Sequence, residues 1–278
     1  MKAAGLAERR RTLRAARFEL TAELRDDFLR LRSAAQRNWL ISRLLEETAS
    51  DLTHLNELAQ RFVAGSERPE IAHEWQSSRA DLSAGELRIE GQQVMQAWER
   101  PYMEAMAAAV AASHGEVLEV GFGLGISATA IQNAGVRSHT IIECHHDVLA
   151  HATAWQAAYP GRDIRLVSGR WQDAIDALGE FDGIFFDTYP LTEDEFNDHM
   201  VEDVTFARHF FAAAARHLRT GGVFVYYSNE IDSVSRRHQR GLFEHFRSVT
   251  FSVCRPLHPP ADCNYWWADS MVVAMATK

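Results

Sequence analysis

Little in this sequence favours a disulfide-rich, membrane-spanning or nucleic-acid-binding protein. Its three cysteines form no CxxC pair, and their odd number argues against a disulfide framework. No apolar run approaches the roughly 20 residues that a membrane-spanning helix needs. The 29 Lys and Arg are outnumbered by 38 Asp and Glu, so the chain lacks the basic surface that nucleic acid requires. We expect a soluble cytoplasmic protein without nucleic acid or membrane as a partner, and the acidity says nothing against a small cationic substrate.

Proline is also missing before Pro69, so nothing forbids long helices in the first part of the chain. Apolar residues recur there at helical spacing among Arg and Glu. Small, polar and proline residues gather at 64–86, which is typical of a linker or lid. We interpret residues 1–85 as a helical domain that forms a lid or the interface of a homodimer.

From about Val94 the pattern changes to short apolar strands separated by helical segments. The predicted strands are 116–120, 139–144, 163–169, 181–186, 221–228, 246–256 and 270–278, and the predicted helices are 127–134, 147–158 and 206–218. This alternation implies an α/β fold with a mostly parallel, doubly wound sheet, here in a domain of residues 86–278.

A glycine loop, "VLEVGFGLG", places Gly121, Gly123 and Gly125 between a buried strand and a helix. Glycines let a backbone turn tightly and approach a ligand whose anionic group meets the start of the helix, although a turn without a ligand has the same composition. The next strand ends in Glu143, 18 positions after Gly125 (143 − 125), where dinucleotide folds place the acidic residue that binds ribose. Together the two features favour a nucleoside site.

The spacing of the glycines indicates which nucleoside. The loop reads G-x-G-x-G, whereas the NAD fingerprint is G-x-G-x-x-G, which disfavours a dehydrogenase. Glu119 before the loop is typical of S-adenosylmethionine-dependent methyltransferases, which this chain resembles, and its charge would compensate the methionine ammonium.

A third segment, "SGRWQD", lies where such enzymes hold adenine. Trp171 would stack on the base or pack in the core, and Gln172 or Asp173 would bond the exocyclic amine.

The strand 181–186 ends directly in Asp187, within "FDGIFFDTYP". A carboxylate at the end of a buried strand is costly unless a positive group meets it. We therefore expect a cation at this position.

Several motifs, in order from about Leu87 to the C-terminus, closely resemble those of guanidinoacetate N-methyltransferases. They are "VMQAWERPYM", "VLEVGFG", "IIEC", "FDGIFFDTYPL", "LRTGGV" and "PPADCNY", whereas "GRWQD" and "CHHDVL" look more like arginine methyltransferases that act on the internal, delta nitrogen. The resemblance implies a seven-stranded methyltransferase sheet with an antiparallel last strand and S-adenosylmethionine as cofactor. It also implies that two carboxylates, Glu99 and Asp187, hold a guanidino group.

A guanidinium is almost always protonated, so its nitrogens are poor nucleophiles. We expect Asp187 to be the charge partner and proton acceptor and Glu99 to be the second arm, because carboxylates make bidentate bonds to N–H donors. Trp98 and Tyr102 would wall the site or serve as core aromatics. The complete set of expected substrate-binding residues is Trp98, Glu99, Tyr102, Asp187, Tyr189, Asn229 and Glu230, and Asp187 is also expected beside the cofactor.

The choice of guanidine depends on the loop "SNEIDS", which departs from the L-T-S-W segment of the family. Glu230 there would suit the ammonium of free L-arginine, unless it points to solvent. We therefore expect arginine, with guanidinoacetate as the alternative and a protein substrate less favoured. The D-T-Y-P-type site favours a terminal nitrogen as the acceptor, and the resemblance to the delta-nitrogen enzymes leaves the internal nitrogen as the alternative.

The sequence also allows a non-enzymatic function and raises the question of a metal site. A non-enzymatic binding module would use the N-terminal helices. The histidines, among them His145, His146 and His151, form no motif typical of a metal site, and we expect no metal.

Overall fold

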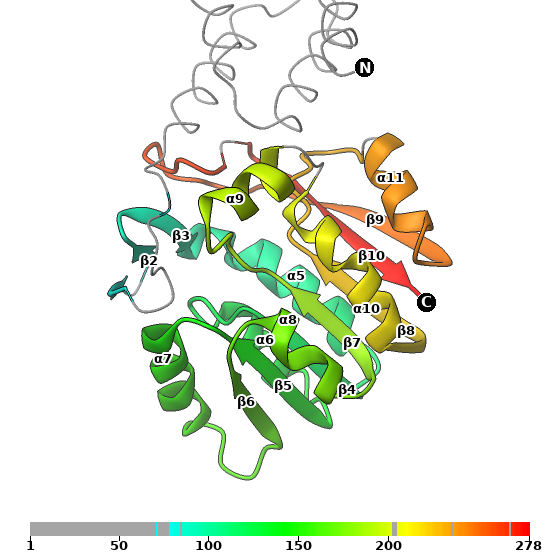
Figure 1. Ribbon diagram of the computed structural model, residues 1–278, viewed down its shortest axis with the longest axis horizontal. Coiled ribbons are helices and arrows are strands. Elements are labelled where there is room, and N and C mark those ends of the chain that lie inside the picture. The colour runs from blue at the N-terminus through cyan, green and yellow to red at the C-terminus, as the bar shows by residue number, and fades with distance from the viewer. Residues whose placement is uncertain (1–70, 72–77, 84, 202–204, 235, 267) are drawn as a thin grey trace, which may run out of the picture.

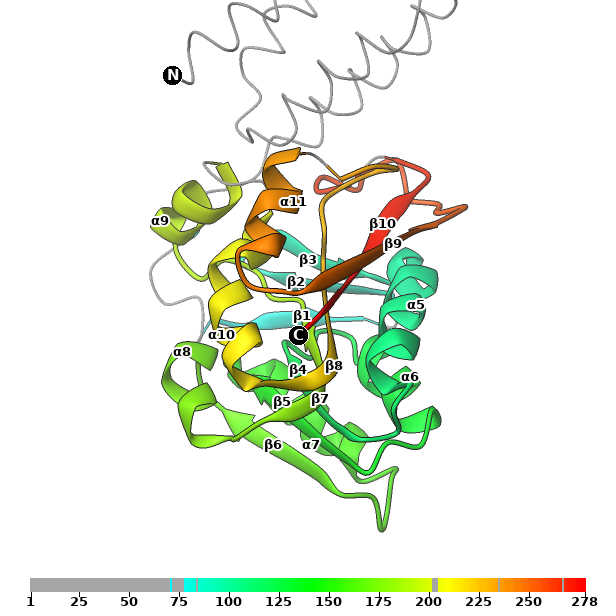
Figure 2. The same cartoon turned by 90° about the vertical axis from the view of Figure 1, so that its right-hand side faces the viewer.

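The computed structural model describes residues 71, 78–83, 85–201, 205–234, 236–266 and 268–278 (Figure 1). Most of the predicted N-terminal helical domain lies outside these residues. The described part contains a seven-stranded sheet, a smaller three-stranded sheet and helices on both faces of the larger sheet (Figures 1 and 2).

The large sheet has the strand order β6-β5-β4-β7-β8-β10-β9. Its strands are β4 (Glu116–Val120), β5 (Ser138–Glu143), β6 (Ile164–Ser168), β7 (Phe181–Phe186), β8 (Leu218–Tyr226), β9 (Ser248–Cys254) and β10 (Met271–Thr277). The strands from β4 to β8 are parallel, whereas β10 pairs antiparallel with both β8 and β9. The predicted fold class, with its antiparallel last strand, is confirmed.

Helices cover both faces of this sheet, with α5 and α6 on one side and α8, α10 and α11 on the other (Figure 2). The α-helices are α5 (Arg100–Ala111), α6 (Ile126–Asn133), α7 (His146–Gln156), α8 (Trp171–Ala174), α9 (Glu193–Glu195), α10 (Phe211–His217) and α11 (Arg236–Phe243). Short 3₁₀ or π turns are η2 (Ala97–Glu99), η3 (Ile175–Ala177), η4 (Phe196–Val201) and η5 (Phe206–Phe210).

The sheet separates two hydrophobic cores because successive side chains of a strand point to opposite faces. In β7, Phe185 packs with the core beneath α5 and α6, whereas Ile184 and Phe186 pack with the core beneath α10. Both faces are buried, which explains why the central strands read as continuous apolar runs.

The small antiparallel sheet was not predicted from the sequence. It consists of β1 (Ala80–Leu82), β2 (Glu86–Ile89) and β3 (Gln92–Gln96). The hairpin between β2 and β3 turns through Glu90 and Gly91, both with positive φ, as primed hairpin turns require. Part of the segment that we interpreted as a linker is therefore strand, and the domain boundary that we placed after residue 85 falls inside this sheet.

None of the helices in the described ranges is both long and apolar enough to cross a bilayer.

Candidate active site

A cavity opens at the carboxyl ends of β4, β5 and β7, where ligands bind in open α/β sheets. The small sheet forms another side of the cavity through Leu87 and Ile89 of β2 and Met95 of β3. The wall thus joins segments from both ends of the described chain.

The glycine loop follows β4 and is built on close backbone approaches. A Cβ on Gly121, which has φ of 91°, would lie 2.0 Å from the carbonyl oxygen of Asp187. A Cβ on Gly123 would lie 2.6 Å from Sδ of Met95. Gly125, with φ of 70°, is the N-cap of α6. Gly121 and Gly123 line the cavity, and Gly125 is not among the described lining residues.

Glu143 ends β5 and holds the glycine loop in place. Its carboxylate accepts hydrogen bonds from the backbone N–H of Phe122 (2.9 Å) and of His145 (2.8 Å). Burial raises the pKa of Glu143. Because Glu143 also lines the cavity, its remaining lone pairs are available to the hydroxyl groups of a ligand.

Glu119 lies beneath the glycine loop and is completely buried. It accepts a hydrogen bond from the hydroxyl of Ser127, and its Oε2 lies 2.9 Å from Nε2 of His139 without the alignment of a hydrogen bond. Glu119 is not among the described residues that line the cavity. The structure therefore places it under the loop, where it braces α6 through Ser127.

Trp171 begins α8 and has two roles that the sequence could not separate. Its ring packs against Phe210, His209 and Phe186, with centroid distances of 4.9, 5.5 and 6.4 Å. It also lines the cavity, as does the exposed Gln172 next to it. Asp173 is not among the described lining residues.

Glu99 and Asp187 face the same cavity from different elements. Glu99 ends η2, and its Oε1 accepts hydrogen bonds from the backbone N–H of Gln96 (2.8 Å) and the hydroxyl of Tyr265 (2.6 Å). Asp187 directly follows β7 and is half-buried, with its backbone N–H bonded to the carbonyl of Val120 (3.0 Å).

Both carboxylates are held in an unfavourable environment. Burial raises the pKa of Glu99 to about 8, and the negative charge of Asp187 adds to the rise. Burial raises the pKa of Asp187 to about 7, and the charge of Glu119 adds to it. A cation bound between Glu99 and Asp187 would lower both pKa values.

Trp98 and Tyr102 are not among the described residues that line the cavity. The indole N–H of Trp98 donates to Oε1 of Gln96 (2.9 Å), and its ring stacks on that of Tyr265. Tyr102 is fully buried, and its hydroxyl donates to the carbonyl of Val272 (3.0 Å). Trp98 thus supports Gln96 and Tyr265, the two residues that bond Glu99, whereas Tyr102 packs in the core.

Tyr189 and Asn229 line the cavity, whereas Glu230 is not among its described lining residues. The hydroxyl of Tyr189 donates to Oε1 of Gln92 (3.3 Å). Glu230 Oε1 lies 3.0 Å from Nδ1 of the buried His238. This carboxylate is thus engaged by His238, so its charge no longer supports an ammonium subsite.

Several lining residues were not singled out from the sequence: Tyr227, Tyr265, His209, Arg170 and Glu195. His145, which also lines the cavity, was considered there only as a metal ligand. Tyr265 belongs to the "PPADCNY" motif, and Tyr227 directly follows β8, so the signal for these two was present. Arg170 contacts Glu195 across the cavity rim, a pairing that sequence spacing does not reveal.

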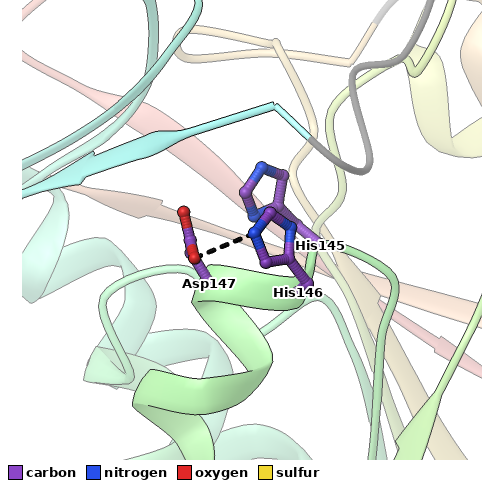
Figure 3. A group of neighbouring side chains, drawn as sticks. All are labelled: His145, His146 and Asp147. Carbon is purple, nitrogen blue, oxygen red and sulfur yellow. Dashed lines mark ion pairs between the residues drawn. The ribbon is translucent and has the colours of Figure 1, made fainter.

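His145, His146 and Asp147 form a compact group at the start of α7, with atoms suited to metal ligation within 4.8 Å of one another (Figure 3). His146 Nε2 lies 3.0 Å from Asp147 Oδ1, and Asp147 Oδ2 accepts a bond from the backbone N–H of Ala80 in β1 (2.9 Å). The two imidazole rings are stacked, with an interplanar angle of 21° and a centroid distance of 5.1 Å. The expected absence of a metal stays a prediction.

The strand order, the glycine loop and the acidic residue at the end of β5 are those of S-adenosylmethionine-dependent methyltransferases. Spermidine synthase from Thermotoga maritima has a similar fold, with a TM-score of 0.51 at 15% identity over 72% of each chain. The family model of guanidinoacetate N-methyltransferase matches residues 62–278. The chain belongs to the guanidinoacetate N-methyltransferase family, whose cofactor is S-adenosylmethionine.

Curated relatives are similar over a shorter stretch. The chain is 35% identical over 105 residues to protein arginine N-methyltransferase 2 of Eremothecium gossypii, covering 34% of this chain and 25% of that protein. It is 36% identical over 118 residues to the protein of the same name from Aspergillus fumigatus, covering 40% and 27%. The match spans about a quarter of the length of these relatives.

Proposed function

We propose that this protein transfers a methyl group from S-adenosylmethionine to a terminal guanidino nitrogen of a small molecule, and that free L-arginine is its preferred substrate. The observation that carries this proposal is the pair of carboxylates of the buried Glu99 and the half-buried Asp187, whose pKa values are raised to about 8 and about 7 in one cavity. Such a pair is costly without a cation, and a guanidinium supplies both a positive charge and the N–H donors that carboxylates accept.

The residues present fit the cofactor. Any side chain at Gly121 would collide with the Asp187 backbone, so the loop lies tightly against the end of β7, and its Gly121 and Gly123 line the cavity. Glu143 provides acceptors for ribose hydroxyls, and Trp171 provides an aromatic surface at the end of β6. When bound, S-adenosylmethionine supplies an electrophilic methyl group.

The chain's own residues then prepare the nucleophile. Asp187 binds the guanidinium and takes a proton from the nitrogen that attacks, because a carboxylate beside that nitrogen can accept the proton that the nitrogen loses as the methyl group arrives. Glu99 binds through Oε2, since Oε1 already accepts from Gln96 and Tyr265. Holding the planar group at two points fixes the direction of attack, which contributes to the rate through orientation.

The charge of the cavity wall supports arginine over guanidinoacetate. Glu99, Glu143, Asp187 and Glu195 line the cavity, and the one Lys or Arg among its described lining residues is Arg170, which contacts Glu195. Arginine carries a net positive charge and guanidinoacetate none, so an acidic wall favours arginine. The relatives named protein arginine N-methyltransferase 2 also favour an arginine-type group.

A direct assay distinguishes arginine from the other candidate substrates. The protein is incubated with S-adenosylmethionine and, separately, L-arginine, guanidinoacetate or an arginine-rich peptide, and the products are identified by mass and fragmentation. The proposal expects N-methyl-L-arginine modified on a terminal nitrogen as the main product. If only guanidinoacetate is methylated, arginine is not the substrate. If the methyl group is found on the internal nitrogen, the proposed terminal position is wrong. If no guanidine is methylated, the whole proposal is overturned.

Replacing the carboxylates tests the mechanism. We expect Asp187→Asn to lower kcat by about 100-fold or more, because an amide cannot accept the proton. Glu99→Gln should lower kcat/KM by about tenfold or more through the loss of a charge-assisted bond. Both variants should bind S-adenosylhomocysteine as the wild type does, measured by calorimetry.

Asp182→Asn is the matched control. Asp182 lies near the start of β7, whereas Asp187 follows the end of that strand, and the Asp182 carboxylate accepts a bond from Arg219 (2.9 Å). Its activity should stay near that of the wild type after correction for folded protein. Full activity in Asp187→Asn and Glu99→Gln contradicts the mechanism.

We further infer a cytoplasmic location, since Cys144, Cys254 and Cys263 are all free thiols, as in reducing compartments. The helical domain of residues 1–85 and the homodimer remain proposals, because residues 1–70 lie outside the described ranges.

A further inference from the structure

The hydroxyl of Tyr227 is buried in the cavity wall and has no hydrogen-bond partner among the described residues. Buried hydroxyl groups are normally hydrogen-bonded, because an unpaired one loses its bonds to water without replacement. Because Tyr227 also lines the cavity, its unpaired hydroxyl is a candidate for bonding a ligand.

The rest of Tyr227 is firmly held. Its backbone N–H donates to the carbonyl of Phe186 (3.2 Å), and its carbonyl accepts from the hydroxyl of Thr205 (3.1 Å). Its ring packs edge-on against that of Tyr102, at a centroid distance of 5.5 Å. Because Phe186 directly precedes Asp187, these contacts place Tyr227 beside the residue proposed to take the proton.

Tyr227 also lies close enough to both carboxylates to sense their charges. Burial raises its pKa well above the usual value, and the charges of Glu99 and Asp187 add to the rise. The hydroxyl therefore stays neutral under physiological conditions.

The two carboxylates supply fewer hydrogen-bond acceptors than a guanidinium has donors, so the Tyr227 hydroxyl can serve as a further acceptor. A monosubstituted guanidinium presents five N–H donors. Glu99 Oε1 is already engaged by Gln96 and Tyr265, so the carboxylates offer one oxygen of Glu99 and two of Asp187. A neutral hydroxyl adds an acceptor without adding a third negative charge, which would hold the guanidinium more firmly in its unreactive cationic form.

We propose that Tyr227 is a substrate-binding residue whose hydroxyl accepts an N–H bond from the guanidino group and fixes its plane between Glu99 and Asp187. This inference rests on the proposed function of the site. In the proposed function the glycine loop and Glu143 would hold the cofactor, so its binding would not depend on this hydroxyl.

Tyr227→Phe tests the proposal, since phenylalanine keeps the ring that packs on Tyr102. The dissociation constant of L-arginine is measured by calorimetry on protein saturated with S-adenosylhomocysteine, together with KM and kcat. We expect the dissociation constant and KM of arginine to rise about 5- to 10-fold, as for the loss of one hydrogen bond. Affinity for S-adenosylhomocysteine should change less than about twofold, since no cofactor bond is lost.

Tyr226→Phe is the matched control. Tyr226 is the adjacent tyrosine, fully buried in the opposite core, and its hydroxyl lies 2.6 Å from Nε2 of His238. It should lower the melting temperature, because His238 loses a partner, and leave the affinity for arginine unchanged.

Unchanged arginine affinity in Tyr227→Phe overturns the inference and leaves the proposed function in place. An equal loss of affinity for S-adenosylhomocysteine, or an equal loss of arginine affinity in Tyr226→Phe, also overturns it, because either would indicate a structural effect. If the wild type binds neither arginine nor guanidinoacetate, the proposed function itself fails, and the role of Tyr227 fails with it.

Discussion

At the scale of single residues, the pKa values of the acidic groups are shifted in opposite directions at the two ends of the sheet. At the amino ends of the strands, burial would raise the pKa of Asp182, but bonds from the Glu116 N–H and from Arg219 outweigh it and lower the pKa. At the carboxyl ends, burial raises the pKa of Asp187 and Glu143. Acids without a cationic partner thus gather where a cationic ligand would bind.

This arrangement predicts a pH-dependent gain in stability when Glu99 or Asp187 is neutralised. A carboxyl whose pKa is raised by folding favours the folded state below its unfolded pKa, and that contribution is lost as the pH rises through about 8 for Glu99 and about 7 for Asp187. We expect Glu99→Gln and Asp187→Asn, without ligands, to melt several degrees above the wild type near pH 8.5 and to gain little near pH 5.

Glu104→Gln serves as the control, because Glu104 is half exposed and lies 3.7 Å from Arg100 on the surface of α5. It should show no comparable difference between the two pH values. Melting curves that shift equally at both pH values for the buried pair would contradict this account of their environment.

At the scale of elements, the glycine loop depends on its contact with the end of β7. Gly121 and Gly135 both have positive φ, but only Gly121 has a backbone atom in the way of a Cβ, at 2.0 Å. Position 121 therefore requires glycine for two reasons: its positive φ, and the close approach of the Asp187 backbone, which leaves no room for a Cβ.

We expect Gly121→Ala to abolish detectable binding of S-adenosylhomocysteine and to lower the melting temperature, because the loop must move away from Asp187. Gly135→Ala imposes a similar φ strain where nothing lies within 4 Å, so it should cost only about 1 kcal/mol and keep cofactor binding. Calorimetry and thermal melting of both variants provide the measurement. Equal behaviour of the two would show that φ strain alone explains the effect.

At the scale of the whole molecule, the cavity combines segments that are far apart in the chain. Leu87 of the small sheet, Asp187 after β7 and Tyr265 near the C-terminus all line it. Ligand binding should therefore stabilise the described fold as a unit.

Thermal melting with two cofactors checks the nucleoside that this cavity accepts. A ligand at about 100 times its dissociation constant adds about 2.7 kcal/mol to stability, so S-adenosylhomocysteine should raise the melting temperature by several degrees. NADH should leave it unchanged, because the glycine spacing differs from the NAD fingerprint. If NADH alone stabilises the protein, the result would favour a dehydrogenase over a methyltransferase.

The sequence by itself determined the large sheet, because both-face burial of parallel strands requires continuous apolar runs and the helices between them have a different period. It also indicated Gly121, Glu143 and Asp187, since their chemistry depends on their place directly after a strand. The small sheet was missed because its strands are short and its turn uses Glu90-Gly91, a weaker signal than Asn-Gly.

Only the tertiary structure decided where the side chains of the loops and of the surrounding aromatic residues point. Glu230 turns to His238, Tyr102 is enclosed in the core, and Tyr265, 166 positions from Glu99, reaches its carboxylate. These directions depend on partners that the fold brings from distant segments, so local pattern and spacing carry no information about them. The chain's chemistry was readable from residues at strand ends, whereas the selection of its substrate depends on contacts made between distant parts of the chain.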